Sequence, residues 1–255
     1  MVELKSDAEL TVMRAAGRVV ANALAAVRAH AAVGVSLREL DAIAADVIGT
    51  AGAKSSFLHY HPRFAPGPYP AVICTSVNDV VVHGIPDDYR LRDGDLLSVD
   101  CGAELDGFHG DSAFSMIIGR PRPADEQLIA RAEQALAAGI AAAVAGGRLG
   151  DIGHAVGTIG RAAGYGIPAD FGGHGVGRRM HEDPPVHNDG RPGRGMPLRP
   201  GLVLAIEPMF MAGGRDRYQV RPDGWALATV DGSRAAHVEH TIAVTEHGPV
   251  VLTAP

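Results

Sequence analysis

Four acidic residues of this 255-residue chain lie in segments that otherwise have the composition of buried β-strands. The four segments and their acids are 96–101 with Asp100, 111–118 with Asp111, 202–207 with Glu207 and 237–244 with Glu239. Because strand side chains alternate between the two faces of a sheet, each acid shares its face with small or short residues. The opposite faces carry Leu, Val, Ile, Phe and Met. This pattern predicts a sheet with one bulky face and a carboxylate-lined cavity on the other.

Four carboxylates in one cavity need positive charge among them. Two like charges about 4 Å apart repel by roughly 4 kcal/mol at an effective dielectric near 20. Each acid could instead end its strand in a salt bridge, but the four segments carry no Lys or Arg. Buried charges that lack such partners bind metals, and oxygen ligands suit divalent cations. The set therefore predicts two divalent ions about 3.5–4 Å apart, an arrangement typical of hydrolytic enzymes.

The spacing of Asp100 and Asp111 indicates a β-hairpin. Gly102, Gly107 and Gly110 lie between them, and glycine is typical of hairpin turns. We therefore expect the two aspartates to face each other across the two strands.

Helices are expected before each group of strands. Ser6 and Ser36 are each followed three residues later by Glu, the pattern of a helix-capping box, and the second helix is expected to end near Gly52. The same arrangement returns 112 residues later, since Gly34 corresponds to Gly146 and Gly52 to Gly164. A further helix is expected to begin near residue 124. Chance similarity in an Ala-rich chain is the alternative explanation.

The expected strands follow these helix pairs, at 71–77, 95–101 and 111–118 in the first half and 202–207, 217–229 and 237–244 in the second. Two α-then-β halves related by pseudo-symmetry would each contribute two acids, with helices over the convex face of a curved sheet. This predicts an α+β fold. No low-complexity linker separates the halves, so we expect 1–255 to form a single catalytic domain.

Composition excludes several classes of protein. The formal net charge is −6, from 23 basic and 29 acidic residues, which argues against nucleic-acid binding. The two cysteines show no C-x-x-C spacing, as expected for buried thiols in a reducing compartment. Charged residues interrupt the N-terminal region, and no apolar window appears long enough to span a membrane. We therefore expect a cytoplasmic protein with no membrane contact.

Six stretches of the sequence, taken together, match the motifs of one known family. They are 76–86 (SVNDVVVHGIP), 95–100 (DLLSVD), 110–111 (GD), 172–177 (GGHGVG), 206–208 (IEP) and 238–241 (VEHT). Through them the chain resembles a type I methionine aminopeptidase, a metallopeptidase of the pita-bread fold, over nearly its whole length. The resemblance implies five metal ligands: Asp100, Asp111, His174, Glu207 and Glu239. Asp111 and Glu239 would bridge both ions, Asp100 would bind one, and His174 with Glu207 the other. Taken alone, His174 would be read as a solvated loop histidine.

The resemblance also implies a reaction. The family removes the initiator methionine from the N-termini of nascent polypeptides, with a preference for a small second residue. A water bridging the two ions would attack the first peptide carbonyl, and Glu207 would pass a proton to the leaving amine. His83 and His181 match the histidines that contact the substrate, although spacing alone would equally suit a structural role for His83. The ligand set does not distinguish Co²⁺, Mn²⁺, Fe²⁺ and Zn²⁺.

Matching is weaker for the methionine pocket, which is expected to include Tyr69, Cys74, Met180 and Trp225. Two features depart from the common bacterial pattern. The loop 58–68 is longer and richer in Pro than usual, and Met180 stands where an aromatic residue is frequent. Both bear on the shape of the pocket, although a flexible thioether suits a methionine substrate.

Alternatives within the fold remain. Prolidases and Xaa-Pro aminopeptidases use the same five ligands but usually carry an additional N-terminal domain. Type II methionine enzymes carry an insertion between the histidine ligand and the first glutamate ligand. In this chain Glu207 follows His174 by only 33 residues, which favours type I. A non-catalytic pita-bread binding module would have lost ligands. The family acts on nascent chains as a monomer, so transient ribosome contact is a further hypothesis. A solvated basic rim is the favoured explanation of the candidate arginines. These arginines are Arg178, Arg179, Arg191, Arg194 and Arg199.

Overall fold

Four helices form in the computed structural model, which describes residues 2–63 and 65–254. They are α1 (Asp7–His30), α2 (Leu37–Thr50), α3 (Pro123–Ala142) and α4 (Leu149–Ala162). Both expected capping boxes are present, because the amide of Ser6 donates to Glu9 at 2.8 Å and that of Ser36 to Glu39 at 2.7 Å. The repeat of the helix pair is confirmed as α3 and α4.

The strands form one large antiparallel sheet and two small ones. In chain order they are β1 (Lys54–Ser55), β2 (Ile73–Val77), β3 (Val80–Val82), β4 (Leu96–Leu105), β5 (Phe108–Ile117), β6 (Gly172–Gly175), β7 (Glu182–His187), β8 (Val203–Ile206), β9 (Met209–Met211), β10 (Tyr218–Val220), β11 (Leu227–Thr229), β12 (Ala235–His237), β13 (Glu239–Thr245) and β14 (Gly248–Val251). The large sheet has the order β1-β4-β5-β13-β8-β6-β7, with β2 beside β4 and β14 beside β13. The strands of the two sequence halves therefore meet between β5 and β13.

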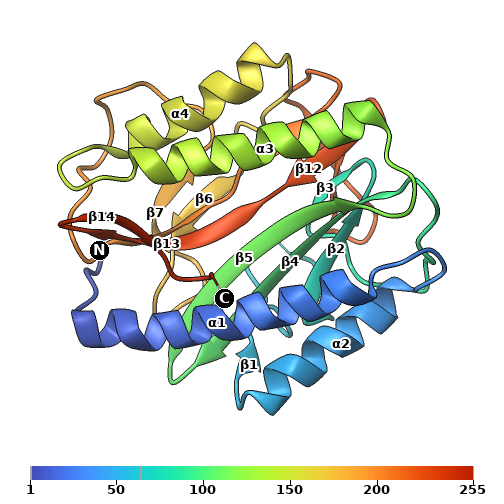
Figure 1. Ribbon diagram of the computed structural model, residues 1–255, viewed down its shortest axis with the longest axis horizontal. Coiled ribbons are helices and arrows are strands. Elements are labelled where there is room, and N and C mark those ends of the chain that lie inside the picture. Colours follow the sequence, from blue (N-terminus) through green and yellow to red (C-terminus); the bar gives the residue numbers. More distant parts are fainter. Residues whose placement is uncertain (1, 64, 255) are drawn as a thin grey trace.

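The helices cover the bulky face of this sheet, with α1 and α3 crossing in front of it (Figure 1). In the first half, Leu97, Val99 and Phe114 pack against α1 and α2. In the second half, the same kind of layer forms between α3, α4 and residues such as Leu204 and Ile242. The bulky face predicted from strand alternation is thus confirmed in both halves. Ala205 and Ala243, which share a face with Glu207 and Glu239, pack in a separate cluster with Met13 of α1.

The hairpin between β4 and β5 differs from the sequence expectation. Its turn lies at Asp106 and Gly107, so Asp111 lies inside β5 instead of opening it. In this register Asp111 pairs with Gly102, and Asp100 pairs with Ala113. The two aspartates are therefore diagonal neighbours on one face and do not lie directly opposite each other.

Gly110 lies inside β5, where α1 passes close to the strand. A Cβ atom at Gly110 would lie 3.0 Å from the Cα atom of Gly17 in α1, which is tighter than ordinary contact. The glycine thus allows the helix to lie directly on β5, and it does not mark a turn.

Two of the expected strands are each divided into two in the structure. The expected strand 217–229 is two short strands, β10 and β11, separated by a turn in which Asp223 accepts hydrogen bonds from the amides of Trp225 and Ala226. The expected strand 237–244 is divided, because His237 ends β12 and Glu239 begins β13. Within the loop 58–68, Phe64 lies outside the described residues.

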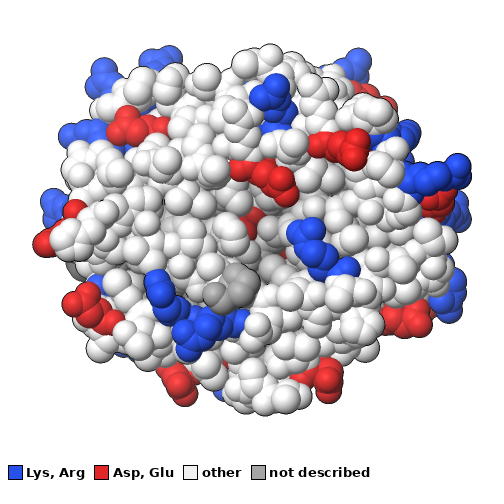
Figure 2. All heavy atoms as spheres, viewed as in Figure 1, with Lys and Arg blue, Asp and Glu red and all other residues white. Residues whose placement is uncertain are grey.

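From the sequence we expected no apolar segment long enough to span a membrane, and α1 corrects this expectation. By length and composition α1 would suffice to cross a membrane, but half of its most apolar window is buried inside the protein, as in the core helix of a globular domain. The helical face of the molecule shows acidic and basic groups interspersed, with no continuous basic surface (Figure 2).

Candidate metal centre

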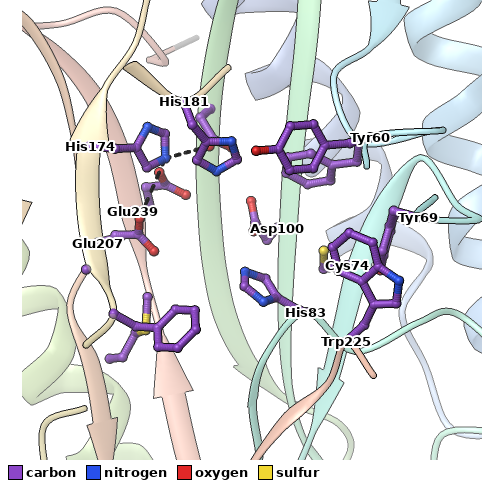
Figure 3. Close-up of a pocket in the computed structure, with 15 residues that line it drawn as sticks. Tyr60, Tyr69, Cys74, His83, Asp100, His174, His181, Glu207, Trp225 and Glu239 are labelled. Atoms are coloured by element: carbon purple, nitrogen blue, oxygen red, sulfur yellow. Dashed lines mark ion pairs between the residues drawn. The ribbon is translucent and has the colours of Figure 1, made fainter. Parts of the chain in front are cut away.

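Five neighbouring strands bring the predicted ligands together. Asp100 lies on β4, Asp111 on β5, His174 on β6 and Glu239 on β13, and Glu207 directly follows β8. All five line one cavity of about 290 Å³. Figure 3 shows Asp100, Glu207, Glu239 and His174 pointing toward a common space. The sequence prediction that these acids converge agrees with this geometry.

Distances among the side chains suit shared ligation. Nε2 of His174 lies 3.6 Å from Oδ2 of Asp111 and 3.7 Å from Oε1 of Glu207. Ligand atoms of Asp111, His174 and Glu239 all lie within 4.8 Å of one another. Such spacing is expected of atoms that surround a cation.

The carboxylates lack other partners. Within residues 2–63 and 65–254, no Lys or Arg forms an ion pair with any of the four acids. One oxygen each of Asp100, Asp111 and Glu239 is buried without a hydrogen-bond partner. Because an unpaired buried carboxylate is unfavourable, these orphaned oxygens fit a divalent cation. The strand-end salt bridges considered from the sequence are therefore wrong.

Protonation equilibria reflect the same crowding. Burial raises the pKa of Asp100 well above its ordinary value, and the charges of Asp111 and Glu207 raise it further. Burial also raises the pKa of Glu239, as do the charges of its neighbours. Burial alone would raise the pKa of Glu207 too, but the His237 ring beside it, followed by His174, leaves that pKa below its ordinary value. Glu207 thus stays ionised at neutral pH.

Hydrogen bonds to the backbone fix the acids in place. The hydroxyl of Thr241 accepts from the amide of Asp111 at 2.9 Å and donates to its carbonyl at 2.7 Å. Ser112 donates to the carbonyl of Glu239 at 2.6 Å. Asn188 donates to the carbonyl of Glu207 at 2.8 Å. Asp111 and Glu239 are thereby held at the junction of the two halves.

Glycines beside His174 allow β6 to fit between its neighbours. A Cβ atom at Gly173 would lie 2.0 Å from the carbonyl oxygen of Ala205 in β8, so any larger residue must push the two strands apart. We expect Gly173→Ala to lower the free energy of unfolding by about 1–3 kcal/mol, the usual cost of overpacking, and to displace His174. Chemical denaturation measures this change. The matched control is Gly49→Ala in α2, where a Cβ atom meets nothing within 4 Å and where Ala favours the helix. Equal stability of Gly173→Ala and the wild type would contradict this account.

Two histidines lie on either side of the carboxylates, with Asp100 between them in Figure 3. His83 follows β3 with a φ of 62°, a conformation unusual for a non-glycine residue, and its ring contacts Phe171 edge-on. His181 lies with its ring centroid 4.3 Å from that of His174 and 5.0 Å from that of Tyr60. Burial lowers the pKa of His83 to about 4. Desolvation also lowers the pKa of His181, although its exposed edge admits water and limits the effect.

An apolar pocket opens beside this centre. Tyr69 and Trp225 pack edge to face with ring centroids 5.0 Å apart, and Cys74 lies next to them. The Tyr69 hydroxyl donates to backbone carbonyls of Ile73 and Gly84, so it turns away from the cavity. Met180 is 4 % exposed and packs in the same apolar cluster, but it does not line the cavity. Its predicted place on the pocket surface is therefore corrected to a supporting position.

Sequence reasoning did not identify four further side chains that line the cavity: Phe57, Tyr60, Phe171 and Met209. Tyr60 and Tyr69 close the base of the long loop, since the amide of Tyr69 donates to the carbonyl of Tyr60 at 2.8 Å. The sequence showed that this loop is long and so bears on the pocket. It gave no sign that Tyr60 contacts His181.

Comparison with known proteins agrees with this geometry. The model of metallopeptidase family M24 matches residues 11–246. Methionine aminopeptidase 1 of Mycobacterium tuberculosis (strain CDC 1551 / Oshkosh) is 52 % identical over 99 % of this chain and 95 % of its own length. The chain belongs to the methionine aminopeptidases of family M24. This confirms the resemblance inferred from the sequence motifs.

Solved structures place this M24 peptidase in the pita-bread fold. The methionine aminopeptidase of Thermotoga maritima superimposes with a TM-score of 0.95 at 38 % identity, over 100 % of both chains. A prolidase from Pyrococcus furiosus gives a TM-score of 0.76 at 21 % identity, covering 99 % of this chain but 65 % of the prolidase. The prolidase shares the fold alone. The predicted α+β, pita-bread class is confirmed.

Proposed function

We propose that this M24 peptidase removes the N-terminal methionine from nascent polypeptides and requires two divalent ions. The observation that supports this most is the cavity in which four carboxylates and His174 converge, with no Lys or Arg partner among the described residues, directly beside an apolar pocket. The pocket would take the methionine side chain, and the carboxylates would hold the ions. The ions would be held by Asp100, Asp111, His174, Glu207 and Glu239.

Bound divalent ions supply polarisation of the peptide carbonyl and activation of water. The remaining steps fall to the side chains. Glu207, which is ionised at neutral pH, accepts a proton from the attacking water and delivers it to the leaving amine. His83 and His181 stay uncharged at neutral pH and donate hydrogen bonds to the substrate amide and to the developing oxyanion.

Specificity for methionine would arise from the apolar walls. Tyr69, Cys74 and Trp225 offer aromatic and sulfur surface, which suits an unbranched thioether. Phe57 also lines these walls, and Met180 supports them from behind. Confinement of the cavity near Tyr60 and His181 favours a small second residue.

Peptide cleavage tests this function. With Co²⁺ or Mn²⁺ present, we expect release of free methionine from Met-Ala-Ser and no cleavage of Ala-Pro, because the pocket is shaped for an unbranched apolar side chain. N-acetyl-Met-Ala-Ser is the control and should remain intact, because its blocked amine cannot approach the carboxylate cavity. Amino-acid analysis of the products measures each outcome. Cleavage of Ala-Pro alone would favour a prolidase-like activity, and binding of Met-Ala-Ser without hydrolysis would favour a binding module.

Several finer points complete the proposal. We assign the ions to the group Co²⁺, Mn²⁺, Fe²⁺ and Zn²⁺, and we place the enzyme in the cytoplasm as a monomer. Transient ribosome contact through the exposed arginines stays a prediction. Arg178 is the least suited of them, because it already pairs with Glu9 at 2.9 Å and lies over the ring of Phe108.

A further inference from the structure

His237 is a buried side chain to which the proposed reaction gives no part. It ends β12 and pairs with Met209 of β9, which places it beside Glu207. The side chain is 2 % exposed, and its Nε2 atom lies 3.3 Å from Oε2 of Glu207. Among the described residues, this Nε2 atom has no partner with full hydrogen-bond geometry. A buried ring nitrogen thus lies beside a carboxylate of the cavity without a completed hydrogen bond.

The two oxygens of Glu207 have different surroundings. Oε1 lies 3.7 Å from Nε2 of His174 and faces the other ligands, whereas Oε2 faces His237. A charge-assisted N–H···O bond is ordinarily about 2.7–2.9 Å long, so the present 3.3 Å contact becomes one when the two groups approach and align. A hydrogen bond to Oε2 would leave Oε1 directed at the cavity.

The backbone of His237 is itself fixed by two buried hydroxyl groups. Its amide lies 3.1 Å from Oγ of Ser115 and 3.3 Å from Oγ of Ser98, and Ser115 donates to its carbonyl at 2.9 Å. The two serines lie directly opposite each other on β4 and β5, with their hydroxyls 2.8 Å apart. Because β12 is not part of the nine-stranded sheet, these hydroxyls replace the missing ladder hydrogen bonds at this point. Such a satisfied buried network specifies one position for the histidine.

We propose that His237 is a positioning residue that orients Glu207 for metal binding. The imidazole donates from Nε2 to Oε2 of Glu207, and Oε1 is thereby directed toward the place of the ions. The inference rests on the proposed metal centre. Loss of an outer hydrogen-bond partner of a metal ligand typically weakens metal binding 10–100-fold.

The competing explanation is that His237 only fills space in the core. Three substitutions separate the two roles. His237→Gln keeps an N–H donor at a similar distance from the backbone, His237→Leu keeps apolar bulk without a donor, and His237→Asn keeps a donor that is too short to reach Glu207. The exposed His154 on α4 provides a control variant, His154→Leu.

Isothermal titration of the metal-stripped full-length protein with Mn²⁺ measures the effect, and circular dichroism confirms folding. We expect the wild type, His154→Leu and His237→Gln to bind within about threefold of one another. His237→Leu and His237→Asn should bind roughly 10–100-fold more weakly. If His237→Leu does not fold, the Mn²⁺ affinities of His237→Gln and His237→Asn are compared instead.

Three results would overturn the inference in distinguishable ways. Wild-type affinity in His237→Leu or His237→Asn would show that no donor is needed. Equal weakening of all three His237 variants would show a packing role. A wild-type protein that binds no Mn²⁺ would remove the metal centre itself, and the inference with it.

Discussion

Replacing Glu207 with Gln should reduce kcat for Met-Ala-Ser by about 10²–10⁴-fold, the range typical of a lost general acid–base group. Gln has nearly the same shape as Glu but does not accept a proton at neutral pH. The backbone carbonyl of Glu207 remains held by Asn188, so the strand geometry should not change. Steady-state kinetics at saturating Mn²⁺ separate this loss from weaker metal binding.

The fold of the Glu207→Gln variant should be intact, with a circular dichroism spectrum equal to that of the wild type. Glu246→Gln is the matched control, because it makes the same chemical change at an exposed turn between β13 and β14. Its kcat should not change. Normal turnover by Glu207→Gln would refute the role of Glu207 as the proton carrier.

Strand alternation predicted that the four acids share one cavity, because each one is exceptional in its own segment. A single carboxylate among apolar residues is visible without knowing any long-range contact, and the opposite, bulky face follows from the same period of two. His174 has no such signal, since it lies in a glycine-rich segment. It was found through the family motif alone.

Register was harder to predict because it depends on contacts between distant elements. Gly110 looks like a turn residue in the sequence, but it lies within β5 because α1 approaches there at Gly17. Similarly, His237 looks like a core residue of one long strand. The break after it, which separates β12 from β13, is what places it beside Glu207.

The residues of the pocket wall were predicted only in part, because the direction of a side chain also depends on register. Tyr69, Cys74 and Trp225 line the cavity, as expected from the weaker match to the family outside its motifs. Met180 instead packs behind the surface, with its terminal methyl group against Gly102. Its direction depends on the diagonal register of β4 and β5, which the sequence did not reveal.

Binding of Mn²⁺ to the metal-free protein should raise its free energy of unfolding substantially. A ligand that binds only the folded state stabilises it by about 2.7 kcal/mol at 100 times its Kd and by about 4.1 kcal/mol at 1,000 times its Kd. Without cations, buried like charges oppose each other across the cavity, since burial and neighbouring acids raise the pKa values of Asp100 and Glu239. Thermal unfolding with increasing Mn²⁺ measures the change in Tm.

Glu239→Gln tests the origin of this effect, because Glu239 is 1 % exposed and one of its oxygens has no hydrogen-bond partner. The substitution should raise the Tm of the metal-free protein at neutral pH and should remove most of the gain on adding Mn²⁺. Since the folded-state pKa of Glu239 lies above its unfolded value, its contribution to stability is greatest below the unfolded pKa and is lost as the pH rises through the folded one. The metal-free wild type should therefore approach the variant in stability as the pH falls from neutral toward the ordinary carboxylate range. A constant difference in Tm between the two proteins across that range would show that repulsion within the cavity is not what the cations relieve.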